Sequence, residues 1–165
     1  MEIVISDSST LILLSKSKLI SIIKSILKIY IPEIVYLEII RGKEKNYKDA
    51  YEIEDMIKNK EIIIINPNQK TISELEKIYK IDAGELYAIA LAKELNKIIL
   101  IDDKKGINAC NYLNIKLYTS LTVLELLFEE EIISKEEAKE SLRLLETYGR
   151  YSKDKIKNIE NKLMW

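Results

Sequence analysis

The sequence predicts an α/β protein with a central, mostly parallel five-stranded sheet that helices cover on both faces. Five short apolar runs alternate along residues 1–120 with longer segments whose apolar residues recur every three or four positions. This alternation is typical of parallel sheets, because the chain must cross back between consecutive strands. Residues 121–165 show the helical pattern alone. We therefore expect them to be a helical extension of the same domain.

The predicted strands are short and rich in isoleucine. The run Ile98–Ile101 is continuous, which is typical of a strand buried on both faces. Asn66-Pro67-Asn68 has the composition of a turn and follows the third strand. The other four predicted strands are Ile3–Ser6, Lys28–Ile31, Glu61–Ile65 and Lys116–Tyr118.

The segments between the strands predict helices with recognisable ends. Pro32 suits the first position of a helix that runs to Arg41, and Gly42 is expected to end it. Ser134-Lys135-Glu136-Glu137 has the spacing of a capping box and predicts a helix to about Thr147. The remaining predicted helices are one through Leu11–Leu14 capped by Ser8, Ser9 or Thr10, then Leu19–Leu27, Asn46–Asn59, Thr71–Tyr79, one from Asp82, one from near Lys104, one through Phe128 capped by Ser120 or Thr122, and Lys153–Leu163.

The composition excludes several kinds of active site. The chain has 165 residues, 47% hydrophobic and 32% charged, which is typical of one globular domain. It contains no histidine, which excludes Ser-His and Cys-His catalysis and histidine-ligated zinc. Its single cysteine, Cys110, excludes an internal disulfide and is expected to be buried in a helix. With 26 basic and 27 acidic residues, no overall basic field indicates nucleic acid.

No export or membrane signal is evident in the sequence. Met1-Glu2 lacks a basic segment, and Asp7 interrupts the first apolar run. No apolar stretch approaches the roughly 20 residues of a membrane-spanning helix. A cytoplasmic location without a membrane partner is therefore expected.

Five carboxylates stand where the predicted fold would bring them to one end of the sheet. Asp7 ends the first strand, and Asp102 and Asp103 follow the fourth. Glu38 and Glu85 lie on helix faces that are otherwise apolar. Ligands of open α/β sheets bind beyond the carboxyl ends of the strands, so these acids are candidates for one site.

The same acids also have a simpler interpretation as helix caps. Asp82 and Glu85 have the spacing of a capping box. Asp102 and Asp103 would be a loop opening followed by the N-cap of the next helix, and Asp7 stands where it would cap the first helix. From the residues alone, the cap and site interpretations both stay open.

A divalent metal ion would explain why so many acids gather. Carboxylates in one partly buried site cannot all stay ionised and unpaired, because repulsion and desolvation are too costly. The sequence offers no histidine and few arginines to neutralise them. An all-oxygen ligand set suits Mg²⁺ or Mn²⁺, and such ions activate water and stabilise the leaving oxygen in phosphodiester cleavage.

Four sequence blocks resemble the PIN-domain superfamily of metal-dependent ribonucleases: VISDSSTLILLSK, IPEIVYLEI, DAGELYAIALAKEL and ILIDDKKG. They are most like a prokaryotic PIN-like subgroup with a GE-x-x-A-I-x-L-A block and an ID-(D/E)-x-x-G block. The resemblance covers about Ile3–Ser120, with the blocks in the family's order and spacing. It implies a three-layer α/β/α fold, with a nuclease core over residues 1–120 and a helical extension over residues 121–165.

The resemblance also implies roles for particular residues. Asp7, Glu38, Glu85 and Asp102 would be the catalytic, metal-binding acids, with Asp103 as an alternative or additional fourth acid. The sequence departs from the family at two of these positions, because many relatives have Asp as the third acid and T-x-D where this chain has IDD. Whether one or two ions bind therefore stays open.

Polar and basic residues near the acids would complete a substrate site. Ser9 or Thr10 would bond a carboxylate or a phosphate, as a Ser or Thr near the first acid does in the family. Each basic residue at the predicted rim would either hold an RNA phosphate or be a solvated surface charge. These basic residues are Lys16, Arg41, Lys43, Lys104 and Lys105.

The resulting prediction is a Mg²⁺- or Mn²⁺-dependent endoribonuclease, and the family likeness suggests the toxin of a toxin–antitoxin pair with an antitoxin protein as partner. The alternative is a PIN-like module without catalysis that binds nucleic acid or protein, and a metal titration separates the two. An Asp-based phosphotransfer domain is disfavoured, because Asn66-Pro67 follows the third strand where it needs an aspartate. Apolar residues of the last helices are expected to pack on the core or in a homodimer: Leu142, Leu144, Leu145, Ile156, Ile159, Leu163 and Trp165.

Overall fold

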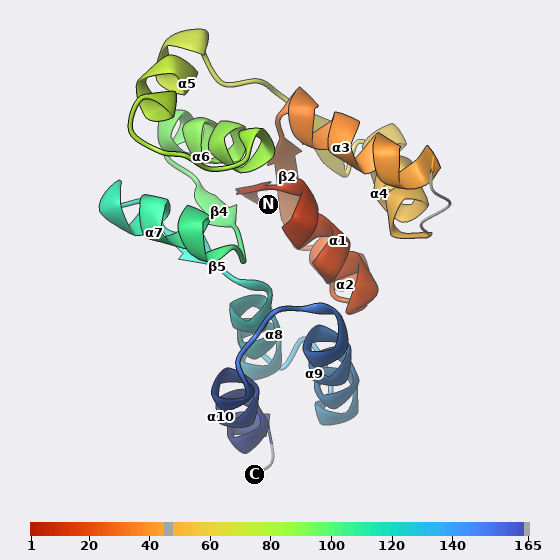
Figure 1. Cartoon of the computed structure of the whole chain (residues 1–165). Helices are drawn as coiled ribbons and strands as arrows, with labels where there is room; N and C mark the ends of the chain where they lie inside the picture. Colours follow the sequence, from red (N-terminus) through yellow and green to blue (C-terminus); the bar gives the residue numbers. More distant parts are fainter. Residues whose placement is uncertain (45–47, 164–165) are drawn as a thin grey trace.

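The computed structural model describes residues 1–44 and 48–163, without the side chain of Lys43 (Figure 1). Its five strands are β1 (Glu2–Ser6), β2 (Leu27–Ile31), β3 (Ile62–Ile64), β4 (Ile98–Leu100) and β5 (Leu117–Tyr118). They form one sheet in the order β3-β2-β1-β4-β5, and every neighbouring pair is parallel. The predicted α/β/α architecture with a five-stranded central sheet is confirmed, and the sheet is wholly rather than mostly parallel.

The order of the strands places a switch point in the middle of the sheet. The chain builds outward from β1 through β2 to β3, then returns to the other side of β1 for β4 and β5. Residues 4–6 of β1 pair with residues 98–100 of β4 across this point. In doubly wound sheets the crevice at such a point, beyond the carboxyl ends of the strands, is where ligands bind. Asp7 and Asp102 follow the two strands that flank it.

Strands β3 and β4 are shorter than the apolar runs that encode them. Ile65 and Ile101 fall just outside β3 and β4, although both were expected to belong to them. Their amides still extend the ladder, from Ile65 N to the Ile31 carbonyl at 2.9 Å and from Ile101 N to the Tyr118 carbonyl at 3.0 Å. The extended backbone therefore continues past the regular part of β4 and places Asp102 beyond the carboxyl end of that strand.

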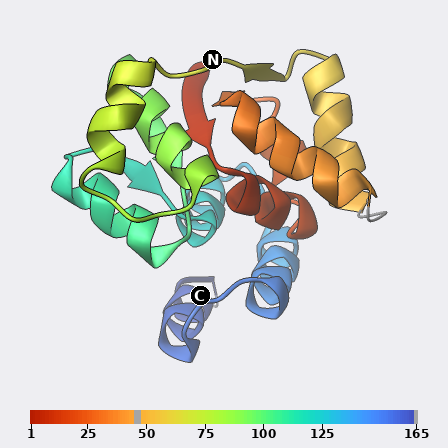
Figure 2. The ribbon, with the colours of Figure 1, turned by 45° about the horizontal axis from the view of Figure 1, so that its top comes forward.

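Helices cover both faces of the sheet, as predicted. A separate hydrophobic cluster lies on each face of the sheet. Val4 and Leu100 belong to one cluster, whereas Ile5 and Ile99 belong to the other. The helices of the first face are α1 (Ser8–Lys16), α2 (Ile20–Ile23), α3 (Glu33–Glu44), α4 (Lys48–Lys58), α8 (Ser120–Glu129), α9 (Lys135–Tyr148) and α10 (Lys153–Leu163). Those of the second face are α5 (Gln69–Glu76), α6 (Ala83–Leu95) and α7 (Lys104–Tyr112). Figures 1 and 2 show α5–α7 grouped apart from α1–α4.

Several predicted helix boundaries differ from those of the structure, including Thr71–Tyr79, which is found as α5 over Gln69–Glu76. The helix expected over Leu19–Leu27 is one short turn, because Leu27 pairs with Glu2 and starts β2 instead. Gly42 does not end α3, which continues to Glu44; an interior glycine costs a helix only about 1 kcal/mol. The helix expected over Asn46–Asn59 is described from Lys48, since residues 45–47 lie outside the described part.

The last three helices pack against the core within this chain. Five of the apolar residues expected to do so are buried in the cluster that also contains Val4 and Leu11, namely Leu142, Leu145, Ile156, Ile159 and Leu163. Leu144 is half-buried, and Trp165 lies outside the described residues. A homodimer and the division into residues 1–120 and 121–165 stay predictions. None of the described helices is long and apolar enough to cross a membrane.

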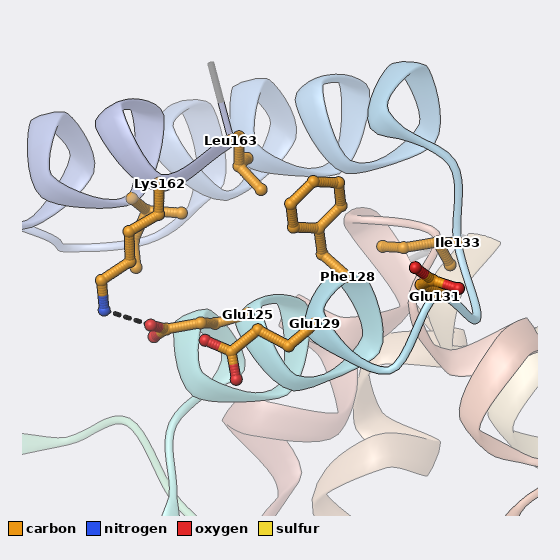
Figure 3. Close-up of a pocket in the computed structure, with 8 residues that line it drawn as sticks. Glu125, Phe128, Glu129, Glu131, Ile133, Lys162 and Leu163 are labelled. Carbon is orange, nitrogen blue, oxygen red and sulfur yellow. Dashed lines mark hydrogen bonds and ion pairs between the residues drawn. The ribbon is translucent and has the colours of Figure 1, made fainter. Parts of the chain in front are cut away.

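A groove of about 560 Å³ separates part of α8 from α10 (Figure 3). Phe128, Ile159 and Leu163 form apolar walls, and Glu129 stands at its edge. Lys162 closes one end through an ion pair with Glu125 (Figure 3). The groove lies at the C-terminal half of α8, away from the helix start that faces the strand ends.

Candidate active site

Asp7 is buried at the end of the central strand and caps the first helix. Its Oδ1 accepts a hydrogen bond from the Thr10 amide at 3.0 Å, and its Oδ2 accepts one from the Ser9 hydroxyl at 3.3 Å. Its exposed fraction is only 1%. Burial raises its pKa to about 6, the hydrogen bonds from Thr10 oppose the rise, and the charge of Asp102 adds to it. The cap interpretation is therefore correct but incomplete, because a cap is not usually buried at such a cost.

Glu38 reaches the same strand end from α3. Its Oε2 accepts a hydrogen bond of 2.5 Å from the hydroxyl of Ser8, the residue next to Asp7. The first turn of α6 approaches it so closely that a Cβ at Gly84 would lie 2.3 Å from Glu38 Oε1. A side chain at this position would therefore force the Glu38 carboxylate to move. The absence of a side chain at Gly84 thus lets the first turn of α6, which carries Glu85, lie close to Glu38.

Glu85 is half-buried in the first turn of α6 and is surrounded by other acids. Burial raises its pKa to about 7, and the negative charges of Asp103, Asp7, Asp82 and Glu38 raise it further, in that order. The capping box expected between Asp82 and Glu85 is not formed, because the Asp82 side chain makes no capping hydrogen bond. The carboxyl group of Glu85 therefore faces the other acids and does not serve its own helix.

Asp102 and Asp103 follow β4 and have different partners. Asp103 is exposed and caps α7, as predicted, with Oδ2 accepting from the amides of Lys105 at 3.0 Å and Gly106 at 3.4 Å. Asp102 is half-buried and accepts from the amide of Ser120 at 3.0 Å and from its hydroxyl at 2.7 Å. The hydroxyl of Tyr151 is a third donor to Asp102.

Tyr151 and Ser120 are functional candidates that no sequence pattern had indicated. Tyr151 lies in the segment between α9 and α10, far along the chain from Asp102, and no spacing connects the two. Burial and the charge of Asp102 raise the pKa of Tyr151 strongly, so its phenol stays a hydrogen-bond donor. Ser120 was expected to cap α8, but Thr119 takes that place and accepts from the Thr122 amide at 3.2 Å. The Ser120 side chain is thereby left to bind Asp102.

The structure brings the predicted acids to one end of the sheet, where they interact electrostatically. We call Asp7, Glu38, Glu85, Asp102 and Asp103 the carboxylate cluster. Each interacts by charge with another member, as the effects on Asp7 and Glu85 show. No ion pair joins a member to a lysine or arginine within the described residues. The cluster is therefore an uncompensated concentration of negative charge.

The carboxylates are not arranged around one common ion position. No three acidic or cysteine side chains of the described residues are placed so that together they could hold a metal ion. Two of the acids are held by hydrogen bonds: Ser8 holds Glu38, and Ser120 and Tyr151 hold Asp102. Ligation by these acids therefore stays a prediction.

The basic residues predicted at the rim fall into two groups. Lys16 lies at the last residue of α1, about 13 Å along the helix from Asp7. Its ammonium pairs with Asp49 at 3.0 Å, so the structure does not bring it to the cluster. Lys104 and Lys105 are exposed at the start of α7, and Arg41 is exposed on α3 one turn after Glu38; these three stay candidates for phosphate contact. The side chain of Lys43 lies outside the described structure.

Ser9, Thr10 and Cys110 complete the surroundings of Asp7. Ser9 is exposed and donates to Asp7, so its hydroxyl lies at the site as predicted. The Thr10 hydroxyl is buried without a well-formed hydrogen bond, although it is near enough to lower the pKa of Asp7. Cys110 is buried on α7, as expected, and burial followed by the charge of Asp7 raises its thiol pKa to about 12. The thiol is therefore neutral and inert.

Comparison with known proteins agrees with this geometry. A family model described as a PIN domain matches residues 3–162, which is nearly the whole chain. The match includes all five members of the carboxylate cluster and also α8–α10. No curated protein is a significant match to the chain.

Proposed function

The chain belongs to the PIN-domain family, and from that premise we propose that it is a Mg²⁺- or Mn²⁺-dependent endoribonuclease. PIN domains are generally nucleases that use divalent metal ions, so nuclease chemistry is the expectation for this fold. The observation that carries the proposal is the carboxylate cluster itself. Five acids gather at the switch point without a cationic partner among the described residues, which a purely structural role would not require.

The donor chemistry of the cluster fits a divalent ion. Its members offer only carboxylate oxygens, the ligands that Mg²⁺ and Mn²⁺ prefer. Two of them, Asp7 and Glu85, have pKa values of about 6 and 7, so a cation that favours their charged forms would bind with release of protons. A bound ion would activate water and stabilise the leaving oxygen of a phosphodiester.

The chain's own residues would contribute position and charge. Asp7 is held by Ser9 and Thr10, and Glu38 by Ser8, so two acids are fixed at the end of β1. The exposed Lys104 and Lys105 directly follow Asp103 and would bind the phosphates on either side of the cleaved bond. Single-stranded RNA is the proposed substrate, because a flexible strand can bring its backbone to acids this deeply set.

The test is a metal titration followed by a cleavage assay. Metal-free protein is titrated with Mn²⁺ and Mg²⁺ by calorimetry, and a generic fluorescent RNA is then offered with each ion and with EDTA. We expect saturable binding and metal-dependent cleavage, both lost in Asp7→Asn. Asp55→Asn, an exposed aspartate of α4, is the matched control and should behave like the wild type. Cleavage that persists in EDTA, or in Asp7→Asn, would contradict the proposal.

A catalytically inactive PIN-like binding module is the alternative. The placement of the acids favours it in one respect, since no three of them among the described residues are arranged to hold one ion. Such a module would bind RNA or protein without saturable Mn²⁺ binding. The same titration therefore decides between the two functions before any substrate is used.

We further propose that the nuclease acts as the toxin of a toxin–antitoxin pair. Induced expression in a bacterial host should then stop growth, and expression of Asp7→Asn at the same level should not. Growth unaffected by an active nuclease would remove the toxin role alone. Co-purification of a small protein encoded beside this chain would identify the antitoxin.

A further inference from the structure

We propose that Tyr151 is a positioning residue of the carboxylate cluster, and that with Ser120 it fixes the carboxylate of Asp102. The inference rests on the proposed function, because it assigns a role within the same site. It also gives the segment between α9 and α10 a part in that site, which the sequence did not suggest.

The hydrogen bonds around Asp102 carry the argument. Its Oδ1 accepts from the Ser120 amide at 3.0 Å and from the Tyr151 hydroxyl, and its Oδ2 accepts from the Ser120 hydroxyl at 2.7 Å. A carboxylate has about four positions at which it can accept, so three donors leave it little freedom to turn. The donors come from the start of α8 and from the segment after α9, so two separate elements determine one orientation.

The chain around Tyr151 is shaped to hold its ring. The residue is half-buried, and its ring packs against the hydrophobic cluster beneath α8–α10. Gly149 lies so close that an added Cβ would be 2.7 Å from Tyr151 Cε2 and 2.6 Å from the Leu145 carbonyl oxygen. A side chain at Gly149 would therefore displace either the ring or the end of α9. Packing of the Tyr151 ring against the hydrophobic cluster and Gly149 therefore orients the phenol hydroxyl toward Asp102.

A competing interpretation is that the hydrogen bond only fastens the last helices to the core. Both interpretations predict a loss of stability when the hydroxyl is removed. They differ on the ion: outer partners that orient a metal-binding carboxylate typically change metal affinity by 10–100-fold when they are removed. A mere fastening would leave the affinity of the folded protein unchanged.

The first experiment measures Mn²⁺ binding to Tyr151→Phe, which keeps the ring and removes the hydroxyl. We expect the Mn²⁺ concentration at half-saturation to rise by about 10-fold or more. The matched control is Tyr148→Phe, an exposed tyrosine whose ring lies 4.9 Å from the Lys16 ammonium, and its half-saturation should equal that of the wild type. Ser120→Ala removes the donor to the other oxygen and should act in the same direction, which covers the case in which Tyr151→Phe folds poorly.

The second experiment is a double-mutant cycle in EDTA, which needs neither metal nor RNA. Tyr151→Phe should lower the melting temperature by about 3–8 °C in the wild-type background, the effect of one hydrogen bond to a charged group. In Asp102→Asn the same substitution should have a clearly smaller effect, because the charged acceptor is gone.

The outcomes separate the inference from the proposed function. Coupling in the cycle together with weakened Mn²⁺ binding supports the positioning role. Absence of coupling overturns it, and so does coupling with unchanged half-saturation, which would leave Tyr151 as a fastening alone. A wild-type protein that binds no Mn²⁺ overturns the proposed nuclease and the metal-dependent role of Tyr151, while the cycle still decides whether Tyr151 holds Asp102.

Discussion

The ends of β1 and β4 present the same kind of residue in two different environments. Asp7 and Asp103 both cap the helix that follows their strand, through backbone amides at about the same distance. Asp7 is buried at 1% exposure and has a pKa of about 6, whereas Asp103 is exposed. The difference follows from the position of the strands, since β1 is central and β4 is next to the edge strand β5.

The comparison shows that the local role of a residue does not determine its chemistry. A cap satisfies helix amides and favours the ionised carboxylate. At the end of β1, desolvation exceeds that benefit and leaves an acid whose charge is unfavourable without a cation. At the end of β4, solvent screens Asp103, and the deeper Asp102 is held by Ser120 and Tyr151. Four predictions test the difference between the two strand ends.

The largest effect is expected at the end of β1. Asp7→Asn preserves the shape and the cap but removes the charge, so RNA cleavage with Mn²⁺ should fall by more than the roughly 10–100-fold typical of losing a group that only orients a metal ligand. Cleavage rates on one RNA at saturating Mn²⁺ provide the measurement. A drop as large in Asp103→Asn would show that the two strand ends are equivalent and would break the comparison.

Gly84→Ala sharpens the comparison by acting at the β1 end alone. The new methyl group would occupy the position of Glu38 Oε1 and should push that carboxylate off Ser8. Cleavage should fall about 10-fold or more, because small displacements of catalytic groups are costly. Stability should change by less than about 1 kcal/mol, since alanine favours the helix. If Gly84→Ala unfolds the protein, the close approach has a structural role that this prediction omits.

The pH dependence of stability should also differ between the two ends. The folded pKa of Asp7, about 6, is raised above the 3.8 of an ordinary aspartate, so its contribution is favourable below pH 4 and is lost as the pH rises through 6. In EDTA, Asp7→Asn should therefore match the wild type near pH 4 and exceed it by up to about 3 kcal/mol at pH 7. Urea unfolding of both proteins across this range measures the difference. Glu85, with a pKa of about 7, should add a decline of the same sign in wild type.

The smallest effect is expected at the end of β4. Asp103→Asn keeps a good cap and should change the free energy of unfolding by less than about 0.5 kcal/mol, whereas Asp103→Ala should lose about 1 kcal/mol. Any gain of either variant near neutral pH should come through Glu85, whose pKa the charge of Asp103 raises, and should stay well below that of Asp7→Asn. A pH-dependent gain in Asp103→Asn similar to that of Asp7→Asn would mean that Asp103 is as strained as Asp7.

The α/β/α architecture could be predicted from the sequence, and so could the acids that are candidates for a site. Isoleucine-rich runs separated by segments with helical periodicity were enough to predict the parallel sheet, because strands that are buried on both faces require such runs. Strand ends and apolar helix faces were enough to make Asp7, Glu38, Glu85, Asp102 and Asp103 candidates for one site, since topology brings those positions to one end of the sheet. Boundaries were less certain wherever pairing competed with propensity, as at Leu27.

Only the tertiary structure decided how each acid is held. The spacing of Asp82 and Glu85 is that of a capping box, but this box does not form. Glu85 instead faces the other acids of the carboxylate cluster, which come from α3 and from the ends of β1 and β4. Sequence spacing also did not indicate that Tyr151 reaches Asp102, because that contact depends on how α9 and α10 pack against the rest of the chain. Periodicity records which face of an element is buried. The depth of burial, and with it the pKa of a carboxyl group, depends on residues that are distant in sequence.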